Sequence, residues 1–403
     1  MLPGKYTNPT NVFVGKGVLL SALTESFTAE DNVLVVCGSN ETAKIIIKEE
    51  IDIFFKNNNI PYTVLKGVES NPKSDKVYDG IAICKKNSIN KIIAIGGGSV
   101  IDTAKSIGIG ANYIGDFFDY FKGNVKVSES LDVGVILTIS GAGSETSDGA
   151  VITHGAFKYA VGSPLMYPKF AVLDPQYTIT VPDKLLYAGI VDSVTHVLER
   201  YFSNTNNVVT SDALCESLIK VLIKLAFKTL NNNKDLEIRM DLMWASKLAH
   251  DSTVGFGRKH DWASHTVAHE IAVRYNTIHG ETLAVIYPAW MKLVSKKGHT
   301  NVLSQLHDKV FSDNEIIQLV GKYSNAIDAY SAFLNKLNMT SSIIKLTNDS
   351  EINRNFADIA NSCSSTTLSG TIGNYTRLNV QDITELLCLA EYEFVDSNKG
   401  ITK

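Results

Sequence analysis

The apolar pattern of this 403-residue chain changes its period close to Pro182. Before that proline, short runs rich in β-branched residues alternate with stretches of helical spacing, which predicts a mostly parallel sheet with helices on both faces. After it, apolar residues recur at a spacing of about 3.6 and strand-like runs nearly vanish. We therefore expect an α/β domain over residues 1–182 and an all-helical domain over residues 183–403. The expected strands lie at residues 33–37, 62–65, 133–140 and 169–175, and in the segment KIIAIGGGS.

Composition excludes several classes of protein. A net charge of −4 offers no basic surface for nucleic acid or anionic membranes. The N-terminal segment MLPGKYTNPTNVFVGKG lacks the basic and apolar regions of a signal peptide, and no apolar run approaches the roughly 20 residues of a membrane span. The five cysteines are scattered without a CxxC pair, which is typical of buried thiols in a reducing compartment. We expect a cytoplasmic protein without nucleic-acid or membrane partners.

The segment KIIAIGGGSVIDTAK places three glycines where a predicted strand turns into a helix. Glycines permit a tight turn there, and main-chain N–H groups at the helix N-terminus favour a pyrophosphate. Ser99 adds a hydroxyl, and Asp102 is in reach of a ribose or the nicotinamide side of a dinucleotide. A single loop of this kind also fits a plain strand–helix turn, but a second one, TISGAGSETSDGAV at residues 138–151, follows another strand. Two such loops on one sheet favour a ligand at its carboxyl edge. Our interpretation of this half of the chain is a Rossmann-like dinucleotide-binding domain.

The first predicted strand, VLVVC, ends in Gly38, Ser39 and Asn40. A nucleotide site that selects NAD usually presents a carboxylate to the ribose 2′-hydroxyl near such a position. None is present in this turn, and glycine and serine leave room and donors for a 2′-phosphate. The turn therefore favours NADP over NAD, unless the selecting group lies elsewhere in the chain.

A carboxylate and several histidines follow Pro182 at spacings that suit a divalent metal. Asp192 and His196 are four residues apart in a predicted helix, so both side chains point to one side. His265 and His269 repeat that spacing in DWASHTVAHEIAV, and His279 follows ten residues later. One carboxylate and several imidazoles are a suitable ligand set for a metal ion. The alternative is a group of capped or core histidines that never meet, and the upstream nucleotide motif favours the metal.

With both motifs considered, the chain resembles the iron-containing (type III) alcohol dehydrogenase family, most closely its NADPH-dependent butanol dehydrogenase and aldehyde reductase branch. The resemblance covers nearly the whole chain. The segments that carry it are YTNPTNVFVGKG, ESNP, GGGSVIDTAK, GAGSETSDGAVIT, FAVLDPQYTITVP, GIVDSVTHVLERY, DWASHTVAHEI and NTIHGETLAV.

The resemblance implies roles for individual residues. The family's metal ligands fall on Asp192, His196, His265 and His279, and a family histidine near the nicotinamide falls on His269. There a neutral imidazole can relay a proton, although a packed neighbour of the ligands is an equal alternative. Lys158 is expected to meet a cofactor phosphate or ribose, its alternative being a solvated surface lysine. The implied nucleotide contacts are Asn71, Gly97, Gly98, Ser99, Asp102, Thr138, Ser147 and Lys158.

The implied reaction is metal-dependent hydride transfer between NAD(P)H and a small alcohol or aldehyde, of which butanol and butyraldehyde are examples. The ligand set accepts Fe²⁺ or Zn²⁺ without choosing between them, and the family is expected to self-associate, with a dimer as the default. Substrate preference stays open, because the segment LAHDSTVGFGRKHDW departs from the branch's usual pattern beside the expected pocket.

Two other functions are compatible with such an architecture. A sugar-phosphate cyclase resembling dehydroquinate synthase needs basic residues around the metal for the substrate phosphate. Near the helical motifs the main candidates are Arg258 and Lys259. A catalytically silent nucleotide-binding paralogue would have lost metal ligands, whereas all four ligand types are present here.

Overall fold

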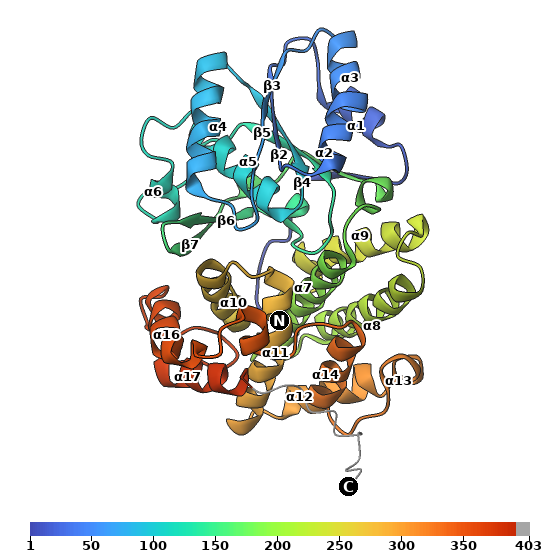
Figure 1. The fold of residues 1–403 in the computed structure, drawn as a ribbon, viewed down its shortest axis with the longest axis vertical. Coiled ribbons are helices and arrows are strands. Elements are labelled where there is room, and N and C mark those ends of the chain that lie inside the picture. Colours follow the sequence, from blue (N-terminus) through green and yellow to red (C-terminus); the bar gives the residue numbers. More distant parts are fainter. Residues whose placement is uncertain (392–403) are drawn as a thin grey trace. The chain divides into compact units, whose positions relative to one another are not determined.

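The computed structural model describes residues 1–391 (Figure 1), so the last residues of the expected helical domain, 392–403, lie outside the described part. The chain forms two compact units. One unit, here the sheet unit, comprises Thr7–Pro182 and Asn233–Asp251. The other, the helical unit, comprises Met1–Tyr6, Asp183–Asn232 and the chain from Ser252 onward. No helix in the described residues is long and apolar enough to cross a membrane.

The sheet unit contains a six-stranded sheet in the order β1-β8-β5-β4-β2-β3, and every neighbouring pair of its strands is parallel. Its central strands are almost wholly buried, as expected when β-branched residues face helices on both sides. The predicted α/β fold with a parallel sheet is therefore confirmed. The strands are β1 (Asn11–Val14), β2 (Val33–Cys37), β3 (Tyr62–Leu65), β4 (Lys91–Gly96), β5 (Asp132–Leu137) and β8 (Phe170–Leu173).

Helices cover both faces of this sheet (Figure 1). On one face, Val77 and Ile107 pack with Leu34 and Ala94 in one apolar cluster. On the other face, Leu23 and Phe55 join a second apolar cluster. The first face is covered by α4 (Ser74–Asn87) and α5 (Gly98–Ala111), and the second by α1 (Leu19–Ser26), α2 (Glu41–Ile46) and α3 (Asp52–Asn57). A short helix, α6 (Phe118–Phe121), contacts the antiparallel hairpin of β6 (Gly149–His154) and β7 (Phe157–Gly162).

Helix α9 (Leu236–His250) belongs to the sheet unit, although it follows Pro182 by more than fifty residues. It contacts β8 and the short helical turn Ser144–Thr146, and its Met243 is part of the apolar cluster under α4 and α5. The helical period of this segment is visible in the sequence. This period predicts an apolar face, but it does not determine which part of the protein that face packs against.

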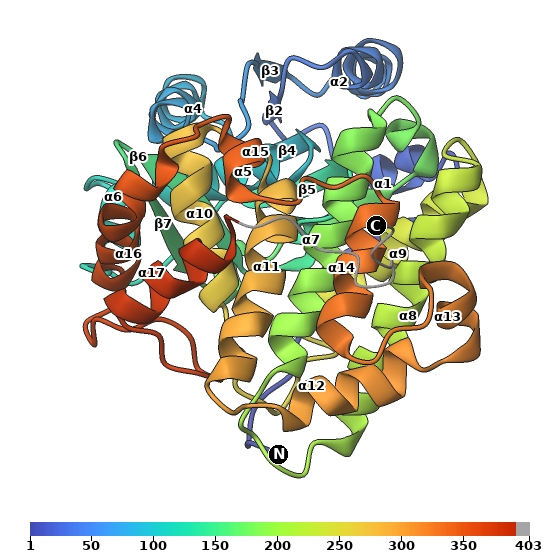
Figure 2. The same ribbon diagram turned by 60° about the horizontal axis from the view of Figure 1, so that its bottom comes forward.

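The helical unit is built around α11 (His279–Lys296), which contacts α7 (Asp183–Tyr201), α10 (Ala263–Tyr275), α14 (Ala326–Lys336) and α17 (Val380–Leu389). Figure 2 shows α11 running between α7 and α10. The unit also contains α8 (Val209–Asn231), α12 (Asn301–Leu306), α13 (Asn314–Val320) and α16 (Phe356–Ser365). One further short helix of this unit is α15 (Ile343–Thr347).

Helices α7 and α11 approach each other closely at Gly280. A Cβ atom at this position would overlap the main-chain carbonyl of Ala188. Glycine therefore permits a crossing in which the N-terminal turn of α11 lies directly against α7. His279 precedes Gly280 on that turn, so the crossing sets where its side chain stands relative to α7.

Candidate metal centre and cofactor loops

Asp192 and His196 lie one turn apart on α7, as their spacing predicts. The two side chains are buried, and His196 Nε2 lies 3.5 Å from Asp192 Oδ1. Most of the surrounding helix is buried too, because its apolar residues pack against α8 and α11. A carboxylate and an imidazole are thus held together inside an apolar bundle.

His265 and His279 approach the same carboxylate oxygen from two other helices. Nε2 of His265, on α10, lies 3.5 Å from Asp192 Oδ1. Nε2 of His279, at the start of α11, lies 3.6 Å from it. One ligand atom from each of Asp192, His265 and His279 lies within 4.8 Å of the others, and the ring of His196 stacks on that of His265 with centroids 4.7 Å apart. The four residues expected to bind the metal therefore lie together.

The chemistry of this group fits a divalent cation. Within the described residues, the buried atoms Asp192 Oδ1 and His265 Nε2 have no hydrogen-bond partner. Buried polar atoms are normally paired, because an unpaired one costs about 1–3 kcal/mol. One carboxylate oxygen surrounded by imidazole nitrogens offers the lone pairs that a metal needs. A bound cation would satisfy both atoms.

Glu199 is part of this centre, although it is not among the ligands predicted from the sequence. It lies one turn beyond His196 on the buried side of α7 and is itself fully buried. Its carboxylate contacts the Nδ1 atom of His265 and accepts a hydrogen bond from the main-chain N–H of His265 at 3.1 Å. Without a bound cation, burial lowers the pKa of His265, but Glu199 and Asp192 raise it more strongly, to about 9. Binding of a cation at Nε2 would release that proton. The readable signal is the spacing Asp192, His196, Glu199, which places all three on one helical face.

His269 lies beside the group and outside the set of atoms that converge on Asp192. Its ring centroid is 5.0 Å from that of His279 and 6.1 Å from that of His265. The side chain is half-buried. An imidazole therefore lies directly beside the metal group.

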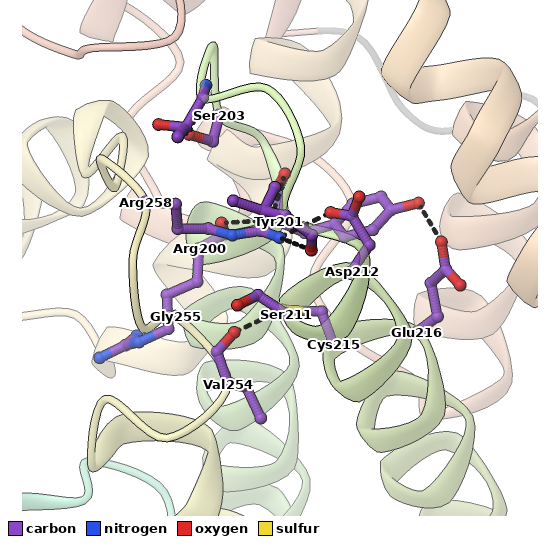
Figure 3. Close-up of polar contacts among 12 residues, drawn as sticks. Arg200, Tyr201, Ser203, Ser211, Asp212, Cys215, Glu216, Val254, Gly255 and Arg258 are labelled. Carbon is purple, nitrogen blue, oxygen red and sulfur yellow. Dashed lines mark hydrogen bonds and ion pairs between the residues drawn. The ribbon is translucent and has the colours of Figure 1, made fainter. Parts of the chain in front are cut away.

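A pair of buried arginines secures the C-terminal end of α7 (Figure 3). Arg258 donates to the main-chain carbonyls of Arg200 and Tyr201 and forms an ion pair of 2.6 Å with Asp212. Arg200 donates to the carbonyl of His196 and lies 4.7 Å over the ring of Trp262. The guanidinium of Arg258 is thus committed to the helix end, which argues against the substrate-phosphate role that a cyclase would require of it.

The glycine loop of the sheet unit is closely packed. Gly97 precedes the first turn of α5, and side chains at Gly97 and Gly98 would overlap Ile139 and Ala142 of the second loop. Thr138 donates its main-chain N–H to the carbonyl of Gly96 at 3.1 Å. The two loops expected to bind the dinucleotide therefore lie against each other at the carboxyl ends of β4 and β5.

A buried lysine that is not among the residues predicted from the sequence connects α5 to the second loop. Nζ of Lys105 lies 2.5 Å from the carbonyl oxygen of Ser144, 2.7 Å from that of Ser147 and 3.0 Å from that of Gly149. Asp102, one turn earlier on α5, accepts from the Ser144 hydroxyl at 2.5 Å and from the main-chain N–H of Val151 at 2.9 Å. Burial raises the pKa of Asp102, and the charge of Lys105 opposes that rise.

The other expected nucleotide contacts lie around these loops. Lys158 is on β7, close enough to Asp102 for its charge to oppose the rise that burial causes in the pKa of that carboxyl. Asn71 has a left-handed backbone with φ of 55° and precedes Pro72, whose carbonyl accepts from Thr153 at 2.7 Å. Gly38 is buried at the end of β2, and Ser39 is exposed beside Gly67. The side chain of Asn40 caps α2.

Comparison with known proteins identifies the class. The model of the iron-containing alcohol dehydrogenase family matches residues 9–175, and the model of the C-terminal part of the Fe-containing alcohol dehydrogenase family matches residues 186–390. The chain belongs to the iron-containing alcohol dehydrogenase family. It is therefore an oxidoreductase of the alcohol dehydrogenase and aldehyde reductase class, which uses NAD(P)H and an iron-type divalent metal.

Several relatives illustrate the range of the family. The chain is 32% identical to the probable NADH-dependent butanol dehydrogenase 1 of Bacillus subtilis, over 95% of this chain and 98% of the relative. It is 30% identical to the NADPH-dependent aldehyde reductase YqhD of Escherichia coli, over 70% of this chain and 73% of the relative. The crystal structure of NADH-dependent butanol dehydrogenase A from Thermotoga maritima matches with a TM-score of 0.88 and 28% identity, covering 97% of this chain and 99% of that chain.

Proposed function

We propose that this protein interconverts small aldehydes and alcohols, such as butyraldehyde and butanol, at a metal held by Asp192, His196, His265 and His279. The observation that carries the proposal is the approach of three imidazole Nε2 atoms to one buried oxygen, Asp192 Oδ1, at 3.5–3.6 Å. The names of relatives supply the substrate class, because they include butanol dehydrogenases and an aldehyde reductase.

The bound metal would act as a Lewis acid that polarises the substrate oxygen during hydride transfer. The residues of the chain do the remaining work. Asp192 contributes the negative charge that retains a cation in an apolar surrounding, and the histidines contribute neutral nitrogen ligands. His269 is proposed to relay a proton, which its position beside His279 supports. A purely packing role for His269 is the alternative.

We further propose that the two glycine loops bind the dinucleotide through Asn71, Gly97, Gly98, Ser99, Asp102, Thr138, Ser147 and Lys158. The loops lie at the carboxyl ends of parallel strands, where such folds bind nucleotides. The start of α5 adds main-chain N–H groups for the pyrophosphate. Lys158 contributes the positive charge nearest to Asp102 on the hairpin.

Within this site we propose a preference for NADP(H) over NAD(H). The exposed Ser39 hydroxyl lies beside Gly67, with the exposed Lys66 next in the chain. Burial raises the pKa of the Cys37 thiol and Lys66 opposes that rise, which places the lysine's charge near the end of β2. Room, a donor and a positive charge suit a 2′-phosphate. Relatives with names of both kinds, NADH-dependent and NADPH-dependent, make the preference a property to be measured.

The metal is proposed to be Fe²⁺ or Zn²⁺. Three imidazoles and a carboxylate contain no thiolate, so the ligand set does not strongly select zinc. A homodimer in the cytoplasm is the proposed state of the protein. The family resemblance supports the dimer. The five cysteines, all of which lie in the described residues, are free, and this supports a reducing compartment.

The test is NADPH oxidation with butyraldehyde by the purified protein, before and after removal of metal with a chelator. Activity should disappear with the metal and return when Fe²⁺ or Zn²⁺ is added. His265→Ala should lose metal and activity together, whereas His299→Ala, outside the metal group, should keep both. Turnover by a fully metal-free protein would disprove the metal-dependent mechanism. A higher kcat/KM with NADH than with NADPH would disprove the cofactor preference.

A further inference from the structure

We propose that Glu199 is a positioning residue that orients His265 for metal binding. The inference rests on the proposed metal function, and it assigns the imidazole a fixed ring orientation and tautomer. In this arrangement Nδ1 of His265 carries its hydrogen and donates it to Glu199. Nε2 then has a free lone pair on the side of Asp192.

The contacts of Glu199 support this role because both of its carboxylate oxygens face the same residue. One oxygen accepts from the main-chain N–H of His265 at 3.1 Å, and the other contacts Nδ1 of its ring. The first contact fixes the start of α10, and the second fixes the rotation of the ring. Nε2 of the same ring lies 3.5 Å from Asp192 Oδ1. Histidines that bind metals commonly donate their other ring N–H to a carboxylate in this way.

The burial of Glu199 indicates that the contact is specific. Its side chain is fully buried, and burying a carboxylate is costly unless donors surround it. Within the described residues no lysine or arginine forms an ion pair with Glu199; its ion-pair partner is His265. A carboxylate kept in an apolar bundle with one histidine as its partner is explained by the orientation of that histidine.

Hydrogen bonds from neighbouring segments anchor the main chain at Glu199 and at the residue that follows it. The carbonyl oxygen of Glu199 accepts from the N–H of Asp261 at 3.0 Å, so α7 is joined directly to the segment before α10. The next residue, Arg200, lies over Trp262. Arg258 donates to the carbonyl of Arg200 at the end of the helix (Figure 3). Glu199 is therefore held next to His265 by contacts that do not involve a metal.

Glu199→Gln tests the inference with almost no change of shape. An amide has one oxygen and one NH2 group, whereas both oxygens of Glu199 face N–H donors. If the NH2 faces the ring, Nδ1 must accept, and the hydrogen moves to Nε2 and blocks the ligand atom. If it faces the main chain, the start of α10 is displaced. Glu216→Gln is the matched control, because one oxygen, Glu216 Oε1, accepts from Tyr201 (Figure 3) and also from Gln305, and an amide oxygen can replace it.

The measurement is Zn²⁺ binding by the metal-free, full-length protein in competition with a chromophoric chelator. The wild-type chain should bind one Zn²⁺, Glu216→Gln should bind it equally well, and Glu199→Gln should bind it about 10- to 100-fold more weakly. Equal affinity of Glu199→Gln and wild type would overturn the inference. Failure of the wild-type chain itself to bind Zn²⁺ would instead refute the proposed metal site.

A second measurement is made on the wild-type protein, and a variant serves only to assign the resonance. In wild-type protein labelled with ¹⁵N-histidine and loaded with Zn²⁺, the His265 ring should show a hydrogen on Nδ1 and none on Nε2. The resonance is assigned by its loss in His265→Gln. A ring that carries its hydrogen on Nε2, or a freely exchanging Nδ1 hydrogen, would contradict the role of Glu199 whatever the variants do.

Discussion

The ammonium group of Lys105 lies 2.7 Å from the carbonyl oxygen of Ser147, across the gap between helix α5 and the loop after β5. Removing it in Lys105→Met would leave buried carbonyl oxygens of that loop without their donor. We expect the free energy of unfolding to fall by about 3 kcal/mol and NADPH to bind roughly tenfold more weakly. Urea denaturation and fluorescence titration measure the two effects. The control is Lys126→Met, at an exposed position. Unchanged NADPH affinity in Lys105→Met would show that the loop does not need the hydrogen bonds of Lys105 to bind the cofactor.

Gly280→Ala is expected to separate α7 from α11. The added Cβ would overlap the carbonyl of Ala188, and main-chain atoms cannot rotate away. The variant should lose about 1–3 kcal/mol of unfolding free energy, and it should bind Zn²⁺ more weakly because His279 is displaced from Asp192. Gly4→Ala, whose Cβ would make an ordinary contact of 3.6 Å with Phe256, should change neither. Unchanged unfolding free energy and unchanged Zn²⁺ affinity in Gly280→Ala would contradict this prediction.

Glu145 makes stability depend on pH. Burial raises its pKa from 4.5 to about 6, while Lys105 and Lys247 oppose the rise and Asp251 adds to it. The protonated form is favoured in the fold, so its stabilising contribution is complete below pH 4.5 and is lost as the pH rises through about 6. Between pH 5 and pH 7.5 wild type should lose about 1 kcal/mol relative to Glu145→Gln. Urea midpoints of both proteins at the two pH values test this, and parallel pH profiles would contradict it.

Ser39→Asp should move the cofactor preference towards NADH. A carboxylate at this exposed position would repel a 2′-phosphate and accept from a 2′-hydroxyl. We expect the ratio of kcat/KM for NADPH to that for NADH to fall roughly tenfold or more. Ser39→Ala separates loss of the hydroxyl from gain of charge and should have a smaller effect. An unchanged ratio in Ser39→Asp would place the selecting group elsewhere.

Sequence patterns were sufficient for the parts of the fold and site that depend on local spacing. The β-branched runs before Pro182 correspond to the buried parallel strands, and the spacing of Asp192 and His196 puts both on one face of α7. The convergence of His265 and His279 on Asp192 comes from helix packing. For these two residues the family resemblance supplied the pairing that spacing alone leaves open.

The residues that escaped prediction are those whose role depends on a distant partner. Lys105 lies within a recognised motif, yet only the fold shows that its ammonium is surrounded by oxygens of residues 144–149. In the sequence Glu199 cannot be distinguished from other acidic residues near helix ends, because its role depends on the contact with His265 that the fold creates. The apolar face of α9 indicates burial without saying where, and its place in the sheet unit follows from contacts with β8.

The exchange of segments between the two units has a consequence for how the protein can be made and divided. Because Asn233–Asp251 completes the sheet unit and Met1–Tyr6 belongs to the helical unit, no single cut in the chain separates the two. A fragment ending at Pro182 would lack Met243 from its core and Lys247 from beside Glu145. During synthesis the sheet unit stays unfinished until α9 has emerged, after α7 and α8 have already left the ribosome. We therefore expect the two units to complete folding together. We also expect that neither unit can be expressed alone by a single truncation of the chain.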